Sequence, residues 1–289
     1  MRKDAAISQT RRRQLLDGLP VKERQLDIAG VTTALLEGGE GPPVVLLHGG
    51  IQVGGVIWWR VIPQLVKTNK VIVPDLPGLG ESDPLERLDL STVTEWLEEF
   101  IRTATDQPPT LVAHSLLGVF AARFAMERRD QLQRLVLVDT PGLGPFRPKP
   151  RLVAALLGSM LRPGPATLDR FMRQVMFDLE LIRKEEGDRW EALMSYLVSL
   201  ATRPDVKKTM RRLPKGNLKT IPEAELRKIK IPVTVIWGKH DPNTRLWTAE
   251  TAAEQLGWPL HVIEWAGHIP HAEQPNAFID ALRSAVAAG

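Results

Sequence analysis

The sequence predicts an α/β fold in which a mostly parallel central sheet is flanked by helices and carries an inserted helical cap. Short apolar runs alternate with segments of helical periodicity, as in sheets built from strand–helix–strand units. The alternation stops near residue 144 and resumes near residue 226. The stretch between has helical periodicity and none of the short apolar runs, which predicts a helical insertion between two strands of one sheet.

Composition excludes several classes of protein. The chain has 289 residues, is 43% hydrophobic, carries a formal net charge of +4 and has no Cys, so disulfides and thiolate chemistry are excluded. Its His, Asp and Glu residues show no metal-ligand spacing along the sequence. Short, scattered basic clusters without interleaved aromatic residues argue against a nucleic-acid partner. No apolar run reaches the roughly 18 residues that span a bilayer. No secretory signal is recognisable, and a cytoplasmic protein is expected.

The pattern divides the chain into three parts. We expect an N-terminal arm over residues 1–24, an α/β core over residues 25–143 and 226–289, and a helical cap over residues 144–225. Five of the seven Met residues lie in the cap. Because Met fills irregular apolar gaps, part of the cap is expected to line a pocket. The candidates are Leu156, Leu157, Met160, Leu161, Phe171, Met172, Val175 and Met176.

The first elements of the core are a hairpin and a buried strand. Residues 23–39 alternate weakly about Ala29–Gly30, which predicts a hairpin. Residues 42–50, PPVVLLHGG, form a continuous apolar run that ends in glycines, as expected of a strand buried on both faces. Residues 57–68 then have helical spacing, although Pro63 lies among them.

Strands and helices alternate through the rest of the core. Ser91 precedes a helical run over residues 92–104 and is expected to be its N-cap. Apolar runs predict further strands within residues 70–83, 110–114, 132–140, 231–241 and 259–268. Helical periodicity predicts helices over residues 116–128, 245–257 and 275–288.

A hydroxyl group stands where one of these strands meets its helix. In TLVAHSLLG, residues 110–118, the apolar run stops at His114 and the helical pattern begins after Ser115. Ligands of parallel α/β sheets bind beyond the carboxyl ends of the strands. A Ser hydroxyl becomes a nucleophile there only if a base removes its proton and an acid orients that base.

An acid and a base follow two later strands. Asp241 comes directly after the strand in VTVIWGKH, and His268 comes directly after the strand in HVIEWAG. The order Ser, Asp, His along the chain is that of one lineage of triad enzymes. Asp139 also follows a strand and is a second candidate for the acid, while His271 is a second candidate for the base.

Four segments together resemble the α/β-hydrolase family over about residues 25–287. HGG at His48–Gly50 resembles the family's oxyanion loop, and DLPGLGESD at residues 75–83 resembles its glycine-containing loop. AHSLLG resembles the nucleophile elbow, although Leu117 stands where the family has a small residue and Gly118 comes one place later. WGKHD and GHIPHAEQP resemble the segments that carry the acid and the base.

The resemblance implies a role for each candidate residue. Ser115 would be the nucleophile, His268 the general base, and Asp241 the carboxylate that orients the imidazole. The backbone N–H groups of Gly50 and Leu116 would hold the oxyanion. No metal or organic cofactor is implied by the resemblance.

The remaining polar residues of these motifs have structural explanations. His48 is expected to hold its own loop in place, and His114 is expected to pack against its neighbours. Asp75 and Ser82 are expected to shape the loop that follows their strand.

Three functions are compatible with such a site. The favoured one is a cofactor-independent carboxylesterase that acts on small to medium apolar esters through an acyl-enzyme. The second is a hydrolase of C–C bonds in ring-cleavage products, or of lactones, for which a basic residue near the cap would bind a second carboxylate. The candidates for that cation are Arg147, Arg151, Arg162 and Arg173. The third is a ligand-binding receptor with a weak triad. Fold and motif alone do not identify the substrate or the oligomeric state.

Overall fold

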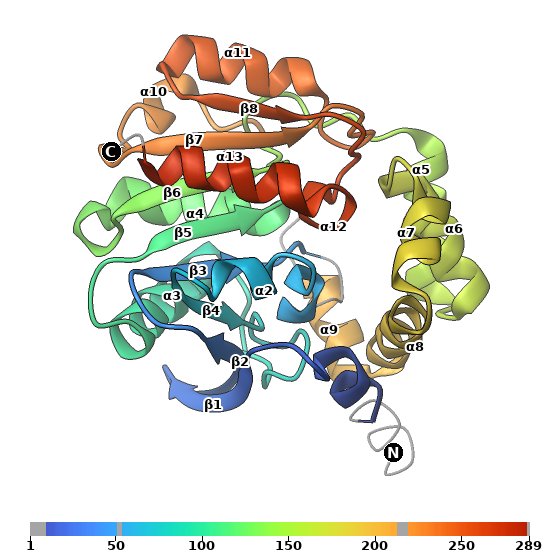
Figure 1. Cartoon of the computed structure of the whole chain (residues 1–289). Helices are drawn as coiled ribbons and strands as arrows, with labels where there is room; N and C mark the ends of the chain where they lie inside the picture. The colour runs from blue at the N-terminus through green and yellow to red at the C-terminus, as the bar shows by residue number, and fades with distance from the viewer. Residues whose placement is uncertain (1–9, 51–53, 213–218, 288–289) are drawn as a thin grey trace.

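The computed structural model describes residues 10–50, 54–212 and 219–287, and its centre is an eight-stranded sheet with helices on both faces (Figure 1). The strand order is β1-β2-β4-β3-β5-β6-β7-β8. The first two strands pair antiparallel with each other, β2 pairs antiparallel with β4, and all other pairs are parallel. The predicted α/β fold class is confirmed. The strands are β1 Lys22–Ile28, β2 Val31–Gly38, β3 Pro43–Leu47, β4 Lys70–Pro74, β5 Thr110–His114, β6 Arg134–Val138, β7 Val233–Gly238 and β8 Leu260–Ile263.

Helices connect the strands and form a separate layer beside the carboxyl edge of the sheet (Figure 1). The connecting helices are η1 Gly55–Trp58, α2 Ile62–Leu65, α3 Leu90–Ala104, α4 Leu116–Glu127, η2 Arg129–Gln131, α10 Glu223–Leu226, α11 Leu246–Leu256, α12 Pro270–Glu273 and α13 Pro275–Ala287. The layer between β6 and β7 consists of α5 Pro150–Leu161, α6 Pro165–Val175, α7 Leu179–Glu186, α8 Asp188–Thr202 and α9 Pro204–Arg212. Within the described ranges, no helix combines the length and the apolar composition that crossing a membrane requires.

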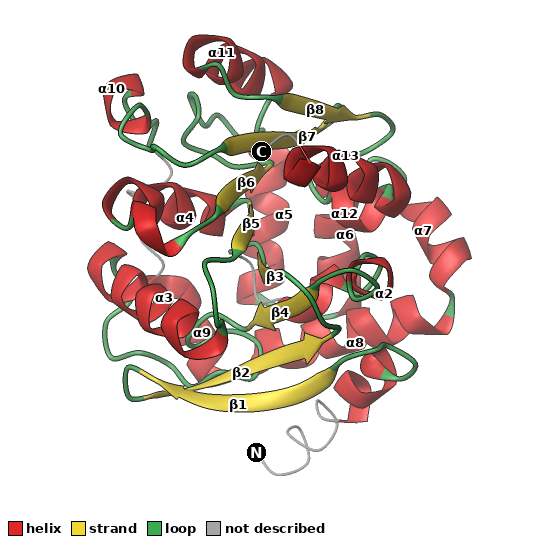
Figure 2. Cartoon of the chain, turned by 60° about the vertical axis from the view of Figure 1, so that its left-hand side comes forward, coloured by secondary structure: helices red, strands yellow, loops and turns green. Residues whose placement is uncertain are grey.

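The hairpin expected about Ala29–Gly30 forms the edge of the sheet (Figure 2). Ile28 pairs with Val31, so the turn has two central residues. Both adopt positive φ, 52° at Ala29 and 74° at Gly30. Two positive φ values are the geometry that matches the twist of the flanking strands in a two-residue hairpin.

The parallel strands are buried on both faces, which explains their continuous apolar runs. Successive side chains of a strand point to opposite faces. On β3, Val44 and Leu46 join one apolar cluster, whereas Val45 and Leu47 join the other. The first cluster includes residues of η1, α2, α13 and the cap helices, and the second includes residues of α3, α4 and α11.

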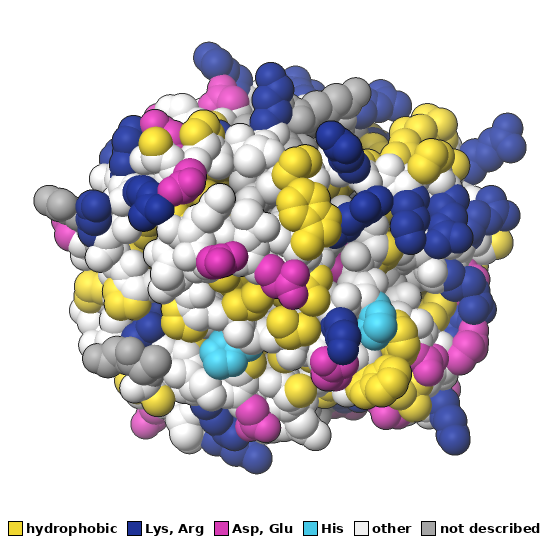
Figure 3. Space-filling view, turned by 90° about the horizontal axis from the view of Figure 1, so that it is seen from above, with side chains coloured by type: hydrophobic (Ala, Val, Ile, Leu, Met, Phe, Trp, Pro, Cys, Tyr) yellow, Lys and Arg dark blue, Asp and Glu magenta, His cyan; other side chains and the backbone are white. Residues whose placement is uncertain are grey.

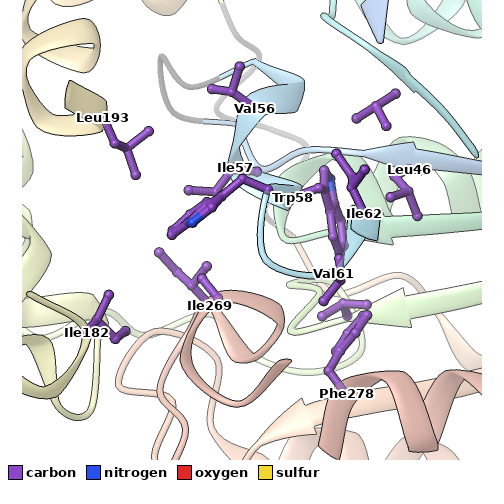
Figure 4. Packing of buried hydrophobic residues seen from close by; sticks show 14 of the residues in the cluster. Leu46, Val56, Ile57, Trp58, Val61, Ile62, Ile182, Leu193, Ile269 and Phe278 are labelled. Carbon is purple, nitrogen blue, oxygen red and sulfur yellow. The ribbon is translucent and has the colours of Figure 1, made fainter. Parts of the chain in front are cut away.

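The cap shares the first of these clusters with the core. Figure 4 shows Ile182 of α7 and Leu193 of α8 on the cap side, across from Ile57 of η1 and Ile269 of the loop before α12. All four side chains are buried. Removal of this apolar surface from water stabilises the contact between cap and core.

Two local predictions are wrong. The helix expected over residues 57–68 is instead the 3₁₀ turn η1 and the single-turn helix α2, in which Pro63 occupies the first turn, where its missing N–H group is tolerated. The N-cap of α3 is Asp89 and not Ser91. Asp89 accepts a hydrogen bond from the Thr92 N–H group at 3.1 Å, and the Thr92 hydroxyl accepts one from the Asp89 N–H group. This reciprocal pair is a capping box.

Helix α4 lies tightly against the loop after β6 at Gly118, which explains the shifted small residue of the elbow. A Cβ atom at Gly118 would lie 2.0 Å from Thr140 Oγ1 and 2.9 Å from Thr140 Cβ. Leu117 points the other way and is 1% exposed within the second apolar cluster. The close contact therefore falls one residue later than the family pattern suggests, and a large side chain at position 117 is accommodated.

Replacing Gly118 by Ala is expected to destabilise the protein because α4 would have to move away from Thr140. Overpacking of this kind typically costs about 1–3 kcal/mol, and urea denaturation should show that loss. Gly158→Ala in α5 is the matched control, since its added Cβ meets nothing within 4 Å. The control should gain about 0.5–1 kcal/mol, as expected for Gly to Ala within a helix. A Gly118→Ala variant as stable as the wild type would contradict the close contact.

Candidate active site

The parallel register of β5, β6 and β7 brings three strand ends to the same edge of the sheet. His114 pairs with Val138, and Val138 pairs with Ile236. The hydrogen bonds continue past the strands, because the Ser115 N–H group donates to Val138 O at 2.8 Å and the Asp139 N–H group donates to Ile236 O at 3.2 Å. Residues that follow these strands are therefore held side by side.

Ser115 occupies a sharp turn between β5 and α4. Its φ of 53° and ψ of −128° lie outside the regions that L-residues ordinarily adopt. Such a backbone conformation is strained and persists only where the surrounding structure enforces it. Here the β5–β6 pairing on one side and the start of α4 on the other hold the turn.

The HGG loop lies against this turn. A Cβ atom at Gly50 would lie 2.6 Å from Leu116 Cδ2, so Gly50 lies directly against the Leu116 side chain. His48 holds the loop as expected: its Nε2 accepts a hydrogen bond from the Leu76 N–H group at 3.0 Å, and its Nδ1 lies 2.6 Å from Gly49 O. The assignment of the Gly50 and Leu116 N–H groups to an oxyanion site stays a prediction.

Ser115, His268 and Asp241 form one chain of hydrogen bonds. His268 Nε2 lies 2.9 Å from Ser115 Oγ, and His268 Nδ1 lies 2.8 Å from Asp241 Oδ2. A carboxylate only accepts hydrogen bonds, so Nδ1 carries the proton and Nε2 is free to accept the proton of the Ser115 hydroxyl. The three candidates that are far apart in the sequence are thus brought together in the arrangement that base-assisted nucleophilic attack requires.

Asp241 is held as a carboxylate. Burial alone would raise its pKa, but the charge and hydrogen bond of His268 and the hydroxyl of Thr244 hold the pKa below its usual value. The Asn243 and Thr244 N–H groups also donate to Asp241 Oδ1, at 2.6 Å and 3.2 Å. The negative charge needed beside His268 is therefore compensated within the site.

Asp139, the second candidate for the acid, lies behind Asp241 as a neutral group. It is completely buried, and its Oδ1 accepts a hydrogen bond from the Gly238 N–H group at 3.0 Å. Burial and the adjacent Asp241 charge raise the pKa of Asp139 well above its ordinary value. Asp241, and not Asp139, is the acid that contacts His268, so Asp139 lies beside the orienting carboxylate and does not replace it.

Asp139, Asp241 and His268 lie close enough together in space to be tested as a metal site. Each offers one ligand atom, and these three atoms lie within 4.8 Å of one another. The His268–Asp241 hydrogen bond uses the imidazole Nδ1 that would face such an ion. Hard cations prefer several oxygen ligands, and this donor set does not fit them.

Glu273, which sequence reasoning missed, fixes the loop that carries His268. Its carboxylate accepts hydrogen bonds from the N–H groups of Gly267 at 2.9 Å and Ile269 at 3.3 Å, which flank His268. It also accepts one at 2.6 Å from the N–H group of Phe177, in the connection between α6 and α7. Burial nevertheless raises the pKa of Glu273 to about 7. The only feature of the sequence that could have indicated this role is an acidic residue within the otherwise uncharged segment IPHAEQP.

The other two histidines near His268 are neutral supports. His114 Nε2 lies 2.6 Å from His268 O, so His114 contacts the base through its backbone as well as by packing. Burial lowers the pKa of His114 to about 3. His271 is completely buried and stacks on Trp58 with 3.8 Å between ring centroids. It is therefore not in the position of a base for Ser115, and this alternative is wrong.

An apolar pocket of about 50 Å³ lies above Ser115. Of the predicted lining residues, Phe171, Met172 and Val175 of α6 face it. The α5 candidates Leu157 and Leu161 are exposed instead, at 49% and 74%. Leu156, Met160 and Met176 are not among the described residues that line the pocket. The described residues that line the pocket are Gly49, Gly50, Ile57, His114, Ser115, Leu168, Phe171, Met172, Val175, Leu197, His268 and Ile269.

Among the described residues that line this pocket there is no Lys or Arg. Of the four arginines considered as carboxylate ligands, Arg173 is paired with Asp169 and Glu180 on the outside of α6, and Arg147, Arg151 and Arg162 are exposed. The pocket therefore suits an uncharged, apolar group.

A hydroxyl on a strained strand–helix turn, a buried His–Asp pair and an apolar pocket under a helical cap define a hydrolase of the nucleophile-elbow class. Residues 44–281 match the profile of the Alpha/beta hydrolase family, and the chain belongs to that family.

Known proteins similar to this chain include several types of hydrolase. A 2-hydroxy-6-oxo-6-(2'-aminophenyl)hexa-2,4-dienoic acid hydrolase from Metapseudomonas resinovorans is 28% identical over 275 residues, which cover 91% of this chain and 90% of that protein. A carboxylesterase from Bacillus subtilis superimposes with a TM-score of 0.82 at 18% identity, covering 100% of both chains. A 2-hydroxy-6-oxo-6-phenylhexa-2,4-dienoate hydrolase from Rhodococcus sp. strain RHA1 superimposes with a TM-score of 0.80 at 22% identity, covering 92% of this chain and 99% of that chain. The chain is accordingly a hydrolase, and the two structures share its fold.

The contribution of Glu273 to stability is expected to decrease as pH rises. The unfolded chain releases this proton near pH 4.5, whereas the folded protein holds it to about pH 7. Between these values the folded state binds more protons, so the free energy of unfolding falls with rising pH, by about 3 kcal/mol in total. In Glu273→Gln this contribution is absent.

The measurement is urea denaturation of both proteins from pH 4.5 to pH 7.5. The difference in unfolding free energy, wild type minus Glu273→Gln, should become smaller across this window. Glu264→Gln is the control for loss of one acid, because Glu264 is 55% exposed and pairs with Lys239 at the surface. Parallel pH profiles for the wild type and Glu273→Gln would contradict the assigned proton.

Proposed function

We propose that the protein is a carboxylesterase that acts on small, uncharged apolar esters through an acyl-enzyme on Ser115. The observation that carries this proposal is the hydrogen-bonded chain Ser115–His268–Asp241, whose hydroxyl end faces an apolar pocket. The small volume of this pocket favours short acyl groups.

In the proposed reaction, Ser115 Oγ attacks the ester carbonyl carbon while His268 Nε2 takes the hydroxyl proton. The imidazolium is stabilised by Asp241, which the neutral Asp139 supports from behind. The carbonyl oxygen becomes an oxyanion that the N–H groups of Gly50 and Leu116 would hold. His268 then gives its proton to the departing alkoxide, and an alcohol leaves.

The acyl-enzyme is then cleaved by the same groups in reverse. His268 Nε2 removes a proton from a water molecule, and the resulting hydroxide attacks the acyl carbonyl carbon. Collapse of the second oxyanion breaks the bond to Ser115 Oγ, which recovers the proton from His268. The products are a carboxylic acid and the free enzyme, and no cofactor takes part in these steps.

The second candidate is hydrolysis of C–C bonds in ring-cleavage products. The names of the dienoate hydrolases similar to this chain favour it. Such substrates carry a carboxylate, and burying an unpaired carboxylate is strongly unfavourable. Since no described residue of the pocket lining is Lys or Arg, the ester is the better match.

Replacing Ser115 by Ala is expected to lower kcat/KM for p-nitrophenyl acetate and butyrate by at least about 10³-fold, because the nucleophile is lost. Ser284→Ala on α13 is the matched control, since it removes an exposed hydroxyl that donates to Asp280 O, away from the pocket. Equal rates for Ser115→Ala and the wild type would refute the proposal.

Two further measurements separate the alternatives. A fluorophosphonate probe should label the wild type and not Ser115→Ala; failure to label the wild type would favour a receptor with a weak triad. Turnover of a carboxylated dienoate more efficiently than of either ester would favour the C–C hydrolase.

The two buried acids are expected to respond differently to amide substitution. Asp241→Asn should lower kcat by about 10³–10⁴-fold, because the amide no longer selects the required tautomer of His268. Asp139→Asn should lower kcat by less than about tenfold, because an amide can still donate to Asp241 and accept from Gly238. Comparable losses in the two variants, measured with p-nitrophenyl acetate, would show instead that Asp139 acts as a carboxylate.

A further inference from the structure

The outer face of α5 is apolar although it faces solvent. Val153 is 39% exposed, Leu157 is 49% exposed and Leu161 is 74% exposed. These residues are four apart, so they lie on one side of the helix. Ala154 and Gly158 lie beside them and add no polar group. We call these five residues the α5 stripe.

The opposite side of α5 accounts for its attachment to the protein. Leu152, Ala155 and Ser159 are buried, and α5 packs against α6. The pocket side of the cap is supplied by α6 and α8. Neither the fold nor the candidate active site therefore explains the apolar residues of the α5 stripe.

The sequence on both sides of the α5 stripe carries only positive charges. The sequence from Thr140 to Leu168 has four basic residues and no acidic residue: Arg147, Lys149, Arg151 and Arg162. All four are exposed. The described part of the chain shows no ion pair to any of them, whereas Arg173 on the neighbouring helix is paired twice. In Figure 3 the cap lies on the right, where hydrophobic side chains and a row of Lys and Arg side chains gather.

We propose that the α5 stripe binds the surface of a lipid bilayer that carries anionic headgroups. An interfacial helix places aliphatic side chains among the acyl chains while flanking Lys and Arg residues contact the headgroups. The strength of such binding increases with the buried apolar area and with the electrostatic attraction to anionic lipids. This proposal does not depend on the reaction assigned to Ser115.

The charges also argue against a second copy of the chain and against a protein partner as the occupant of the α5 stripe. Pairing of two copies through the α5 stripe would bring eight unpaired cations together, and like charges at close range oppose association. A protein partner would have to be acidic around an apolar groove. A bilayer with anionic lipids supplies apolar acyl chains and negative headgroups together, and it needs no specific groove.

The test is sedimentation of the full chain with vesicles of phosphatidylcholine alone and of phosphatidylcholine with about one third phosphatidylglycerol. The wild type is expected to bind the anionic vesicles at least about tenfold more than the neutral ones, and to lose most of this binding near 1 M salt, where charges are screened within about 3 Å. Leu157→Asp/Leu161→Asp should reduce binding to anionic vesicles by about tenfold or more. Arg151→Gln/Arg162→Gln should reduce it by a similar factor.

Val286→Asp on α13 is the matched control, because Val286 is 43% exposed and lies outside the cap. It should bind vesicles as the wild type does. All variants should keep the wild-type melting temperature and the wild-type rate with p-nitrophenyl acetate, since none of these residues lines the pocket. The vesicle experiment tests the α5 stripe even if the wild type has no esterase activity, because sedimentation does not depend on catalysis.

Three results would overturn the proposal. The first is a wild type that does not sediment with anionic vesicles. The second is equal binding by the wild type and Leu157→Asp/Leu161→Asp. The third is a wild-type dimer in sedimentation velocity that Leu157→Asp/Leu161→Asp converts to a monomer, which would assign the α5 stripe to a second copy of the chain.

Discussion

Parallel hydrogen bonding between β5, β6 and β7 is the constraint from which the candidate active site follows. It aligns three strand ends, so the residues after them meet at one edge without any long side chain having to bridge a gap. Because side chains alternate along a strand, a slip of one residue in this register would turn the strand residues to the opposite faces. The buried strands, packed on both faces by different clusters, oppose such a slip.

The orientation of His268 and the shape of the pocket both depend on the end of α6. The His268 N–H group donates to Val175 O at 2.8 Å, and Val175 also lines the pocket. Two residues later, the Phe177 N–H group donates to Glu273, which also holds the loop around His268. A change in the packing of α6 would therefore alter both the shape of the pocket and the orientation of the imidazole.

Burial keeps the number of charges in the site small. Asp241 is ionised and surrounded by donors, whereas the neighbouring Asp139 holds a proton. Burial likewise lowers the pKa of His114 and of His271, and repulsion from the neighbouring His268 lowers both further. With one carboxylate beside one imidazole, the charge that develops on His268 during proton transfer meets a single fixed countercharge.

The sequence by itself determined the fold class, the order of the strands along the chain and the candidates Ser115, Asp241 and His268, because periodicity and local motifs are properties of neighbouring residues. Only the tertiary structure distinguished Asp241 from Asp139, since the two follow similar strands and differ in which one contacts His268. It also decided that α6 lines the pocket while the α5 stripe faces outward, and it gave Glu273 a role. These outcomes depend on contacts between distant segments, and no local pattern encodes the direction in which a cap helix is rotated.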